Sequence, residues 1–218
     1  MENPFELGVD ALRQRLLLMA SRSETAVNGA VQALMQRNYD LALHVRQDDN
    51  LIDQCEVEID DMAIQLLTKA PLAGNLRLIT VAMKISQNLE RIGDEATKIA
   101  KRARDLSQEP PVKINLDLPR MAGLALKMVK DALDSFVQRD SVAARAIIPR
   151  DKEVDAINKS MHQMLAQHMM ENPETISRCL HWIVAAKSLE RIADHAKNIA
   201  EEVVYLCEAQ DIRHTMKR

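Results

Sequence analysis

The sequence predicts an all-α protein made of two tandem, internally duplicated three-helix bundles, six helices in total. Three observations lead to this fold class. Apolar residues recur at helical spacing along most of the 218 residues, and no useful stretch alternates apolar and polar residues as a strand would. Aromatic residues make up only 2% of the chain, so the core must consist of small and aliphatic side chains that suit closely packed helices. The second half of the chain also repeats the first.

Apolar spacing and proline positions together place the helices. In the first helix, apolar or small residues recur at alternating intervals of four and three from Leu12 to Ala33. Asn172 and Pro173 form a helix-start signal, because Asn caps a helix and Pro fits its first position. Prolines also punctuate the chain at positions 71, 110, 111, 119 and 149. The predicted helices cover residues 6–37, 39–69, 74–107, 118–139, 141–170 and 173–208.

The internal repeat is clearest in the third helix of each half. Residues 88–100 read NLERIGDEATKIA and residues 188–200 read SLERIADHAKNIA. Eight of the twelve positions from Leu89 onward are identical to those one hundred residues later. A period this long indicates a duplicated domain and not a solenoid. The proline-rich stretch SQEPPVKINLDLP separates the copies, so we predict one bundle at 1–108, a linker at 109–117, and a second bundle with a short tail at 118–218.

Composition and charge set limits on compartment and partners. The net charge of −3 gives no basis for general nucleic-acid binding, which needs a basic surface. The longest apolar run near the N-terminus is only Leu16 to Ala20, so neither a signal peptide nor a membrane span is expected. Three widely separated cysteines favour a reducing compartment. A soluble, cytoplasmic protein is therefore expected.

Acidic residues recur along one flank of the apolar stripe in the second and third helices of each half. Positions four apart on a helix nearly superpose on one face, so Glu90 and Asp94 lie together beside the stripe that contains Leu89 and Ala96. In the first half, the second helix carries Asp49, Asp53, Glu56 and Asp60 on one flank. The equivalent residues of the second half are Asp151, Asp155, Asn158 and His162, followed by Glu190 and Asp194 on the third helix.

Repeated like charges on facing helices favour a metal site. Acids four apart destabilise a helix by roughly 0.2–0.5 kcal/mol per pair, so they make little sense as a source of stability. A hard or borderline cation held between two helices would neutralise them. The alternative is a solvated acidic face in which Glu90 pairs with Arg91 or with arginines of the first helix. His195, beside Asp194, either joins a second-half site or lies on the surface.

These features resemble the PhoU family of bacterial regulators, which is associated with high-affinity phosphate uptake. The resemblance rests on the LERIGDEATKIA and LERIADHAKNIA segments, the PLAGNLR start of the third helix, and the terminal DIRH. It also rests on the pairs Asp49/Asp53 and Asp151/Asp155, and it covers essentially the whole chain in order. One departure is Asn75, where the family more often has Asp before LR.

The resemblance implies two similar bundles, often dimeric, with multinuclear metal clusters held by the E/DxxxD motifs of each repeat. The metal would be iron, zinc, manganese or magnesium, with its identity left open. The first site would use Asp49, Asp53, Glu90 and Asp94. The second site would use Asp151, Asp155, Glu190 and Asp194.

The resemblance also implies a function. Members dampen the phosphate-starvation response and link the ATPase subunit of the Pst phosphate transporter to its sensor histidine kinase, reaching the membrane only through these partners. No catalytic residues are expected. The rival hypothesis is a ferritin-like, carboxylate-bridged oxidase or metal store, which needs Glu-x-x-His on two helices. No such motif occurs, and the nearest pattern is Asp211 to His214. A purely structural scaffold would explain the fold but not the repeated acids.

Overall fold

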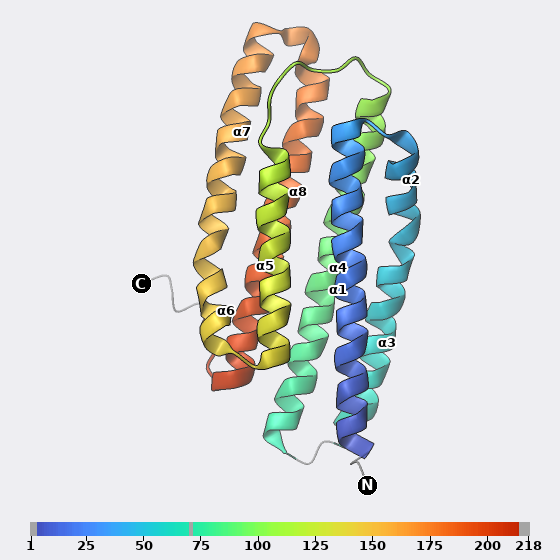
Figure 1. Ribbon diagram of the computed structural model, residues 1–218, viewed down its shortest axis with the longest axis vertical. Helices are drawn as coiled ribbons and strands as arrows, with labels where there is room; N and C mark the ends of the chain where they lie inside the picture. Colours follow the sequence, from blue (N-terminus) through green and yellow to red (C-terminus); the bar gives the residue numbers. More distant parts are fainter. Residues whose placement is uncertain (1–3, 70–71, 214–218) are drawn as a thin grey trace.

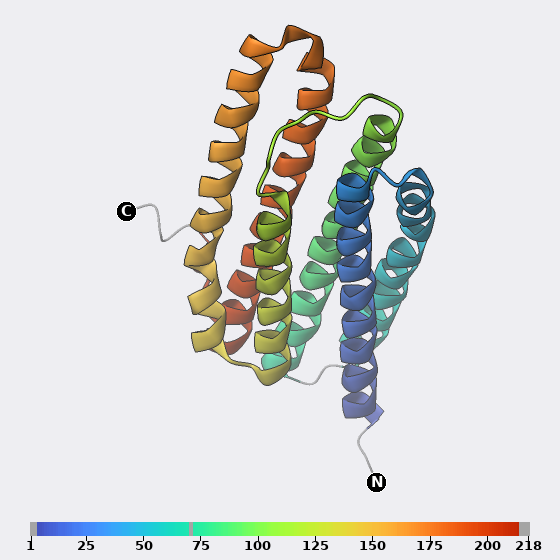
Figure 2. The same cartoon turned by 45° about the horizontal axis from the view of Figure 1, so that its top comes forward.

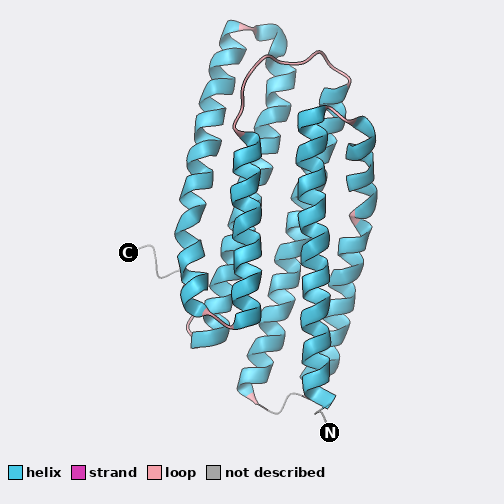
Figure 3. Cartoon of the chain, viewed as in Figure 1, coloured by secondary structure: helices cyan, strands magenta, loops and turns pink. Residues whose placement is uncertain are grey.

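The structure, a computed structural model, describes residues 4–69 and 72–213. Within these residues every regular element is helical, which confirms the predicted all-α fold (Figure 3). The helices of the first half are α1 (Pro4–Gln36), α2 (Tyr39–Asp48), α3 (Asn50–Leu67) and α4 (Ala73–Ser107). Those of the second half are α5 (Leu118–Gln138), α6 (Ser141–Ile147), a 3-10 turn at Ile148–Arg150, α7 (Asp151–Glu171), a 3-10 turn at Pro173–Thr175, and α8 (Ile176–Glu208).

The turn after the first helix of each half is built in the same way. Arg37 and Arg139 adopt the left-handed conformation, with φ of 56° and 53°, and this ends α1 and α5. The next residue then caps the following helix. Asn38 Oδ1 accepts a hydrogen bond from the Leu41 amide at 3.0 Å, and Asp140 Oδ1 accepts two at 2.9 Å. The duplication therefore extends to the backbone conformation of the turns.

The predicted second helix of each half is interrupted in the structure. In the second half, Pro149 cannot donate to the helical ladder, and a 3-10 turn separates α6 from α7. In the first half the break lies at Asp49, whose carbonyl accepts from the Ile52 amide at 2.8 Å, a tight i to i+3 bond. The predictions of one continuous helix at 39–69 and another at 141–170 are therefore wrong at these two breaks. Each break lies beside the first acid of a predicted metal site.

The helices run along the long axis of the molecule, with α2 and α3 at one edge and α6 and α7 at the other (Figures 1 and 2). Between the edges, α4 packs against α8 and α1 packs against α5. Contacts along the central pair show that α4 and α8 are antiparallel: they join Arg102 to His181, Glu95 to Arg191, Asn88 to His195, and Lys84 to Glu202. The two halves are thus related by an approximate twofold axis near the middle of α4 and α8.

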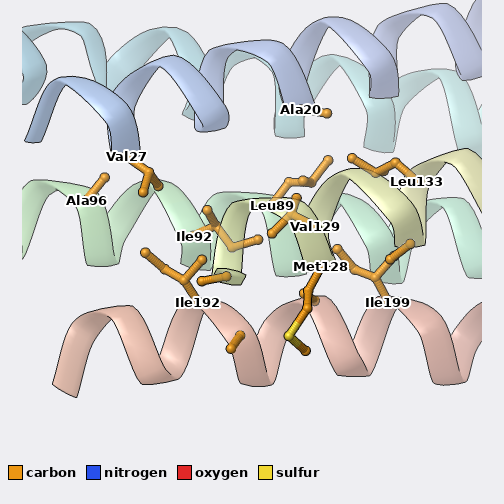
Figure 4. Packing of buried hydrophobic residues seen from close by; sticks show 14 of the residues in the cluster. Ala20, Val27, Leu89, Ile92, Ala96, Met128, Val129, Leu133, Ile192 and Ile199 are labelled. Atoms are coloured by element: carbon orange, nitrogen blue, oxygen red, sulfur yellow. The ribbon is translucent and has the colours of Figure 1, made fainter. Parts of the chain in front are cut away.

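The core is continuous across both halves. Val27 of α1, Ile92 of α4 and Ile192 of α8 belong to one cluster of buried apolar residues, and Figure 4 shows their side chains in the same apolar layer. Ala96 and Ala196 are fully buried in this cluster, and such small side chains allow helices to pack closely. The two bundles therefore share a core in addition to being joined by a linker.

Because the core is shared, a destabilising substitution in one half should also lower the stability of the other half. Ile92→Ala removes a fully buried side chain from α4 and should lower the free energy of unfolding by about 2–5 kcal/mol. The only tryptophan, Trp182, lies on α8 in the other half. In urea titrations, circular dichroism and tryptophan fluorescence should report the same midpoint, and Ile92→Ala should lower both. If Ile92→Ala left the fluorescence midpoint unchanged, a shared core would be contradicted.

Candidate functional site

The first acidic cluster, defined as Asp49, Asp53, Glu90 and Asp94, lies where α3 packs against α4. Burial raises the pKa of Asp49, and the neighbouring charge of Asp53 raises it further. Burial likewise raises the pKa of Glu90, with Asp94 as the next cause. Asp94 also raises the pKa of Asp49, and Asp53 that of Glu90, so charges on the two sides of the contact act on one another, as the sequence predicted.

Two further acids extend this cluster along α3. Burial and then the charge of Asp60 raise the pKa of Glu56, and Glu56 in turn adds to the repulsion at Glu90. One Oδ atom of Asp60 is buried and accepts no hydrogen bond from the described residues. The first half therefore presents a run of six carboxylates along the contact between α3 and α4.

Arg91 supplies positive charge to the first acidic cluster. Its guanidinium lies 3.3 Å from the Glu90 carboxylate and 3.2 Å from that of Asp94. The pairing of Glu90 with Arg91, which was the alternative to a metal, is therefore present. The arginine side chain is 62% exposed, however, and exposed ion pairs contribute only about 0–1 kcal/mol. The repulsion among the acids is only partly offset.

The second acidic cluster, defined as Asp151, Asp155, Glu190 and Asp194, lies at the equivalent contact of α7 with α8. Burial raises the pKa of Asp155 and of Asp194, and in both cases the charge of Asp151 is the next cause. Asn158 donates a hydrogen bond to Glu190 at 3.0 Å across the two helices. The predicted second set of acids is thus also brought to one place.

Unsatisfied acceptors at both clusters suit a bound cation. In the described part of the chain, Asp151 Oδ1, Asn158 Oδ1 and His162 Nε2 are buried without a hydrogen-bond partner. His162 occupies the position equivalent to Asp60, which has an unsatisfied oxygen of its own. Such groups are stabilised by a ligand that accepts their lone pairs. The first donor set is all oxygen, which suits hard cations, and the second adds an imidazole nitrogen.

The side chains do not converge on a single point, however. Across residues 4–69 and 72–213, no three His, Cys, Asp or Glu side chains are arranged to hold one metal ion. The structure brings the eight predicted acids into two clusters, and binding of a cation would require their carboxylates to turn toward it.

The groove between α4 and α8 was missed by the sequence reasoning. Asp94 and Asp194 both line this polar groove, so the two clusters flank it. At its base Glu95 is only 4% exposed and accepts from Lys98 at 2.8 Å and from Arg191 at 3.2 Å. Although burial would raise the pKa of Glu95, hydrogen bonds from these side chains and from Ser188 hold it below its usual value. The sequence feature that could have revealed the groove is Glu95 itself, a charged residue inside the apolar stripe of α4.

His195 fits neither interpretation that the sequence left open. It is half-buried, and its Nδ1 lies 3.0 Å from Asn88 Oδ1 in the other half. Burial lowers its pKa. Gly93 was also missed: a methyl group there would come within 2.8 Å of Ile52 Cδ1 and 3.2 Å of Asp49 Oδ1. The glycine therefore lets α4 approach α3 at the first cluster.

The fold and site define a class: a duplicated helical-bundle protein with one acidic cluster at the outer helix contact of each half. The family described as "PhoU domain" matches residues 16–103 and 118–203, and the chain belongs to the PhoU family. The resemblance found in the sequence is confirmed.

Curated relatives match nearly the whole chain. The phosphate-specific transport system accessory protein PhoU homolog of Pseudomonas aeruginosa is 41% identical over 212 residues, covering 96% of this chain and 88% of that protein. The PhoU accessory protein of Escherichia coli is 32% identical over 211 residues, with the same coverage of 96% and 88%.

Solved structures agree with the fold. The crystal structure of PhoU from Pseudomonas aeruginosa matches with a TM-score of 0.91 and 40% identity, over 94% of this chain and 100% of that one. The phosphate transport system regulatory protein PhoU from Streptococcus pneumoniae matches with a TM-score of 0.88 and 26% identity, over 95% and 99%. In the described residues, no helix has the length and apolar character needed to span a bilayer.

The raised pKa of Glu90 predicts that neutralising this side chain stabilises the fold, and that the stabilisation depends on pH. A folded-state pKa above the usual 4.5 means that charged Glu90 destabilises the fold at pH 7, and this cost disappears as the pH falls through the folded-state pKa toward 4.5. In protein stripped of metal, Glu90→Gln should therefore raise the melting temperature by about 1–2 °C at pH 7. The gain should shrink as the pH falls through the folded-state pKa, because the parent then becomes protonated at Glu90 as well. His195 titrates in both proteins, so its opposing effect cancels. A gain that does not change with pH would contradict the assignment.

Proposed function

We propose that this protein is a cytoplasmic, non-enzymatic regulator of phosphate uptake and of the phosphate-starvation response. The observation that carries the proposal is the family match, which includes both halves of the chain. The relatives named above are described as accessory or regulatory proteins of phosphate transport. An accessory protein acts by contacting other proteins, so in this proposal the chain regulates its partners by binding them through its surface and catalyses no reaction.

In this proposal the protein is a negative adaptor between the transporter's ATPase subunit and the sensor histidine kinase of the phosphate regulon, and it works as a homodimer. When phosphate is plentiful, contact with the adaptor stabilises the inactive state of the kinase. This is a shift between two populations of the kinase, and it requires only that the adaptor binds one of them more tightly. The groove between α4 and α8 supports such a role, since it presents charged side chains of both halves on one face.

The two acidic clusters are proposed to hold metal: iron, zinc, manganese or magnesium. Asp49, Asp53, Glu90 and Asp94 would hold a cation between α3 and α4, and Asp151, Asp155, Glu190 and Asp194 would do so between α7 and α8. A bound cation supplies the positive charge that offsets the repulsion among these carboxylates. The carboxylates would then fasten each outer helix to its central helix, which fixes the surface that a partner contacts.

Metal binding predicts a higher melting temperature in the presence of the cation. A ligand at 100 times its dissociation constant stabilises the native state by about 2.7 kcal/mol, or roughly 5–10 °C for a chain of this size. Glu90→Gln/Asp94→Asn should lose part of that shift and part of the bound metal, both measurable by melting with and without chelator and by elemental analysis. If chelation changes neither the melting temperature nor the metal content of the parent, the metal proposal is wrong.

Loss of the protein should leave phosphate-starvation genes active when phosphate is plentiful, as a reporter strain would show. Glu190→Lys/Asp194→Lys should impair repression while circular dichroism still reports a helical protein, because both residues flank the apolar stripe. The matched control is Glu171→Lys/Glu174→Lys, which makes the same charge change at exposed positions away from the groove. Normal regulation in the deletion strain would refute the adaptor proposal. Equal effects of both charge reversals would remove the second cluster from the signalling surface.

A further inference from the structure

The two acidic clusters occupy equivalent places in the repeat but differ in their positive charges. Lys187 and Lys197 lie on α8 beside the second cluster, and the equivalent residues one hundred positions earlier are Gln87 and Thr97. The acids differ in the opposite sense: Glu56 and Asp60 extend the first cluster, where the second half has neutral side chains or a histidine. The first cluster therefore carries the greater excess of negative charge.

Both lysines are bound to acids of the second cluster. Lys197 Nζ donates to Asp151 Oδ2 at 2.7 Å, and the aspartate side chain is only 9% exposed. Lys187 forms an ion pair with Glu190 one turn further along α8. A charge-assisted hydrogen bond to a buried carboxylate is stronger than an exposed ion pair. Two of the four acids therefore already have an ammonium partner.

The arginine common to both repeats offsets only part of this difference, since one arginine faces six carboxylates in the first half. Arg91 remains exposed beside Glu90 and Asp94 of its own cluster. Its equivalent, Arg191, is directed across the groove to Glu95 at 3.2 Å. The second cluster thus relies on lysines, whose compact ammonium groups on flexible stems can occupy a place where a cation would otherwise sit.

We infer that Lys187 and Lys197 are internal counter-ions of the second acidic cluster, so that the first cluster is the tight site for divalent cations and the second is a weak one. This rests on the proposed metal function. A cation entering the second cluster must share Asp151 with Lys197 and is repelled by both ammonium groups. The unsatisfied Asp151 Oδ1 keeps that cluster open to a cation at higher concentration.

The test is a calorimetric titration of the metal-free, full-length protein with Mn²⁺. We expect two classes of site whose affinities differ by about 100-fold, taking about tenfold for each lysine. Glu90→Gln/Asp94→Asn should abolish the tight class, and Glu190→Gln/Asp194→Asn should abolish the weak one. Lys187→Gln/Lys197→Thr gives the second half the residues of the first and should tighten the weak class about 100-fold.

Two controls separate a counter-ion role from a structural one. Lys187→Arg/Lys197→Arg keeps the charge, so the weak class should stay weak. Gln87→Lys/Thr97→Lys places the charges in the first half and should weaken the tight class. If the lysines served only to stabilise the helices, their removal would lower the melting temperature of the metal-free protein without changing Mn²⁺ affinity, and the inference would be wrong.

The Mn²⁺ titration gives different results if the inference is wrong and if the proposed metal function is wrong. If the parent binds no Mn²⁺ at either cluster, both are refuted. If the parent binds Mn²⁺ at two sites of equal affinity, or if removal of the lysines leaves the weak class unchanged, only the inference is refuted and the metal function stands.

Discussion

The antiparallel packing of α4 against α8 is the constraint on which the rest of the structure depends. Fully buried residues such as Ile92, Ala96, Ile192 and Ala196 tie the two central helices into one core. Once these helices are fixed, the outer helices bury their stripes against them, α3 on α4 and α7 on α8, while α1 and α5 complete each bundle. The flank acids of each pair must then face one another, so the apolar packing itself brings like charges together.

Basic side chains offset part of that repulsion in each half, but the two halves use different residues. The first cluster has one exposed arginine, whereas a lysine binds the most buried acid of the second. Burial raises the pKa of acids in both clusters even though Arg91 and Lys197 act in the opposite direction, so the charged state of these carboxylates remains costly. The energy of hydrophobic packing is large enough to hold such groups together, and the residual repulsion leaves each site favourable for an added cation.

Much of this could be predicted from the sequence, because the main signals are local or repeated. The 3.6-residue period, the prolines and the duplication gave the helices to within a few residues, and the positions of Glu90 and Asp94 followed from helical geometry alone. The break at Asp49 could not be predicted, since no proline or glycine marks it. The shared core and the groove could not be predicted either, because both depend on how one half faces the other. Gly93 is needed for a close approach that exists only in the packed state.

The repeat also explains why its two copies cannot be chemically equivalent. The approximate twofold axis that pairs Arg191 with Glu95 places Arg91 near His195, because Glu95 and His195 are equivalent positions. Half-buried His195, whose pKa is lowered, offers Arg91 no carboxylate, so that arginine turns to Glu90 and Asp94. Arg191 is held by Glu95 instead, and the second cluster obtains its positive charge from lysines. The difference of Glu95 against His195 thus accounts for the unequal distribution of the arginines. Together with the lysines of α8 and the additional acids of α3, it makes the two acidic clusters electrostatically distinct.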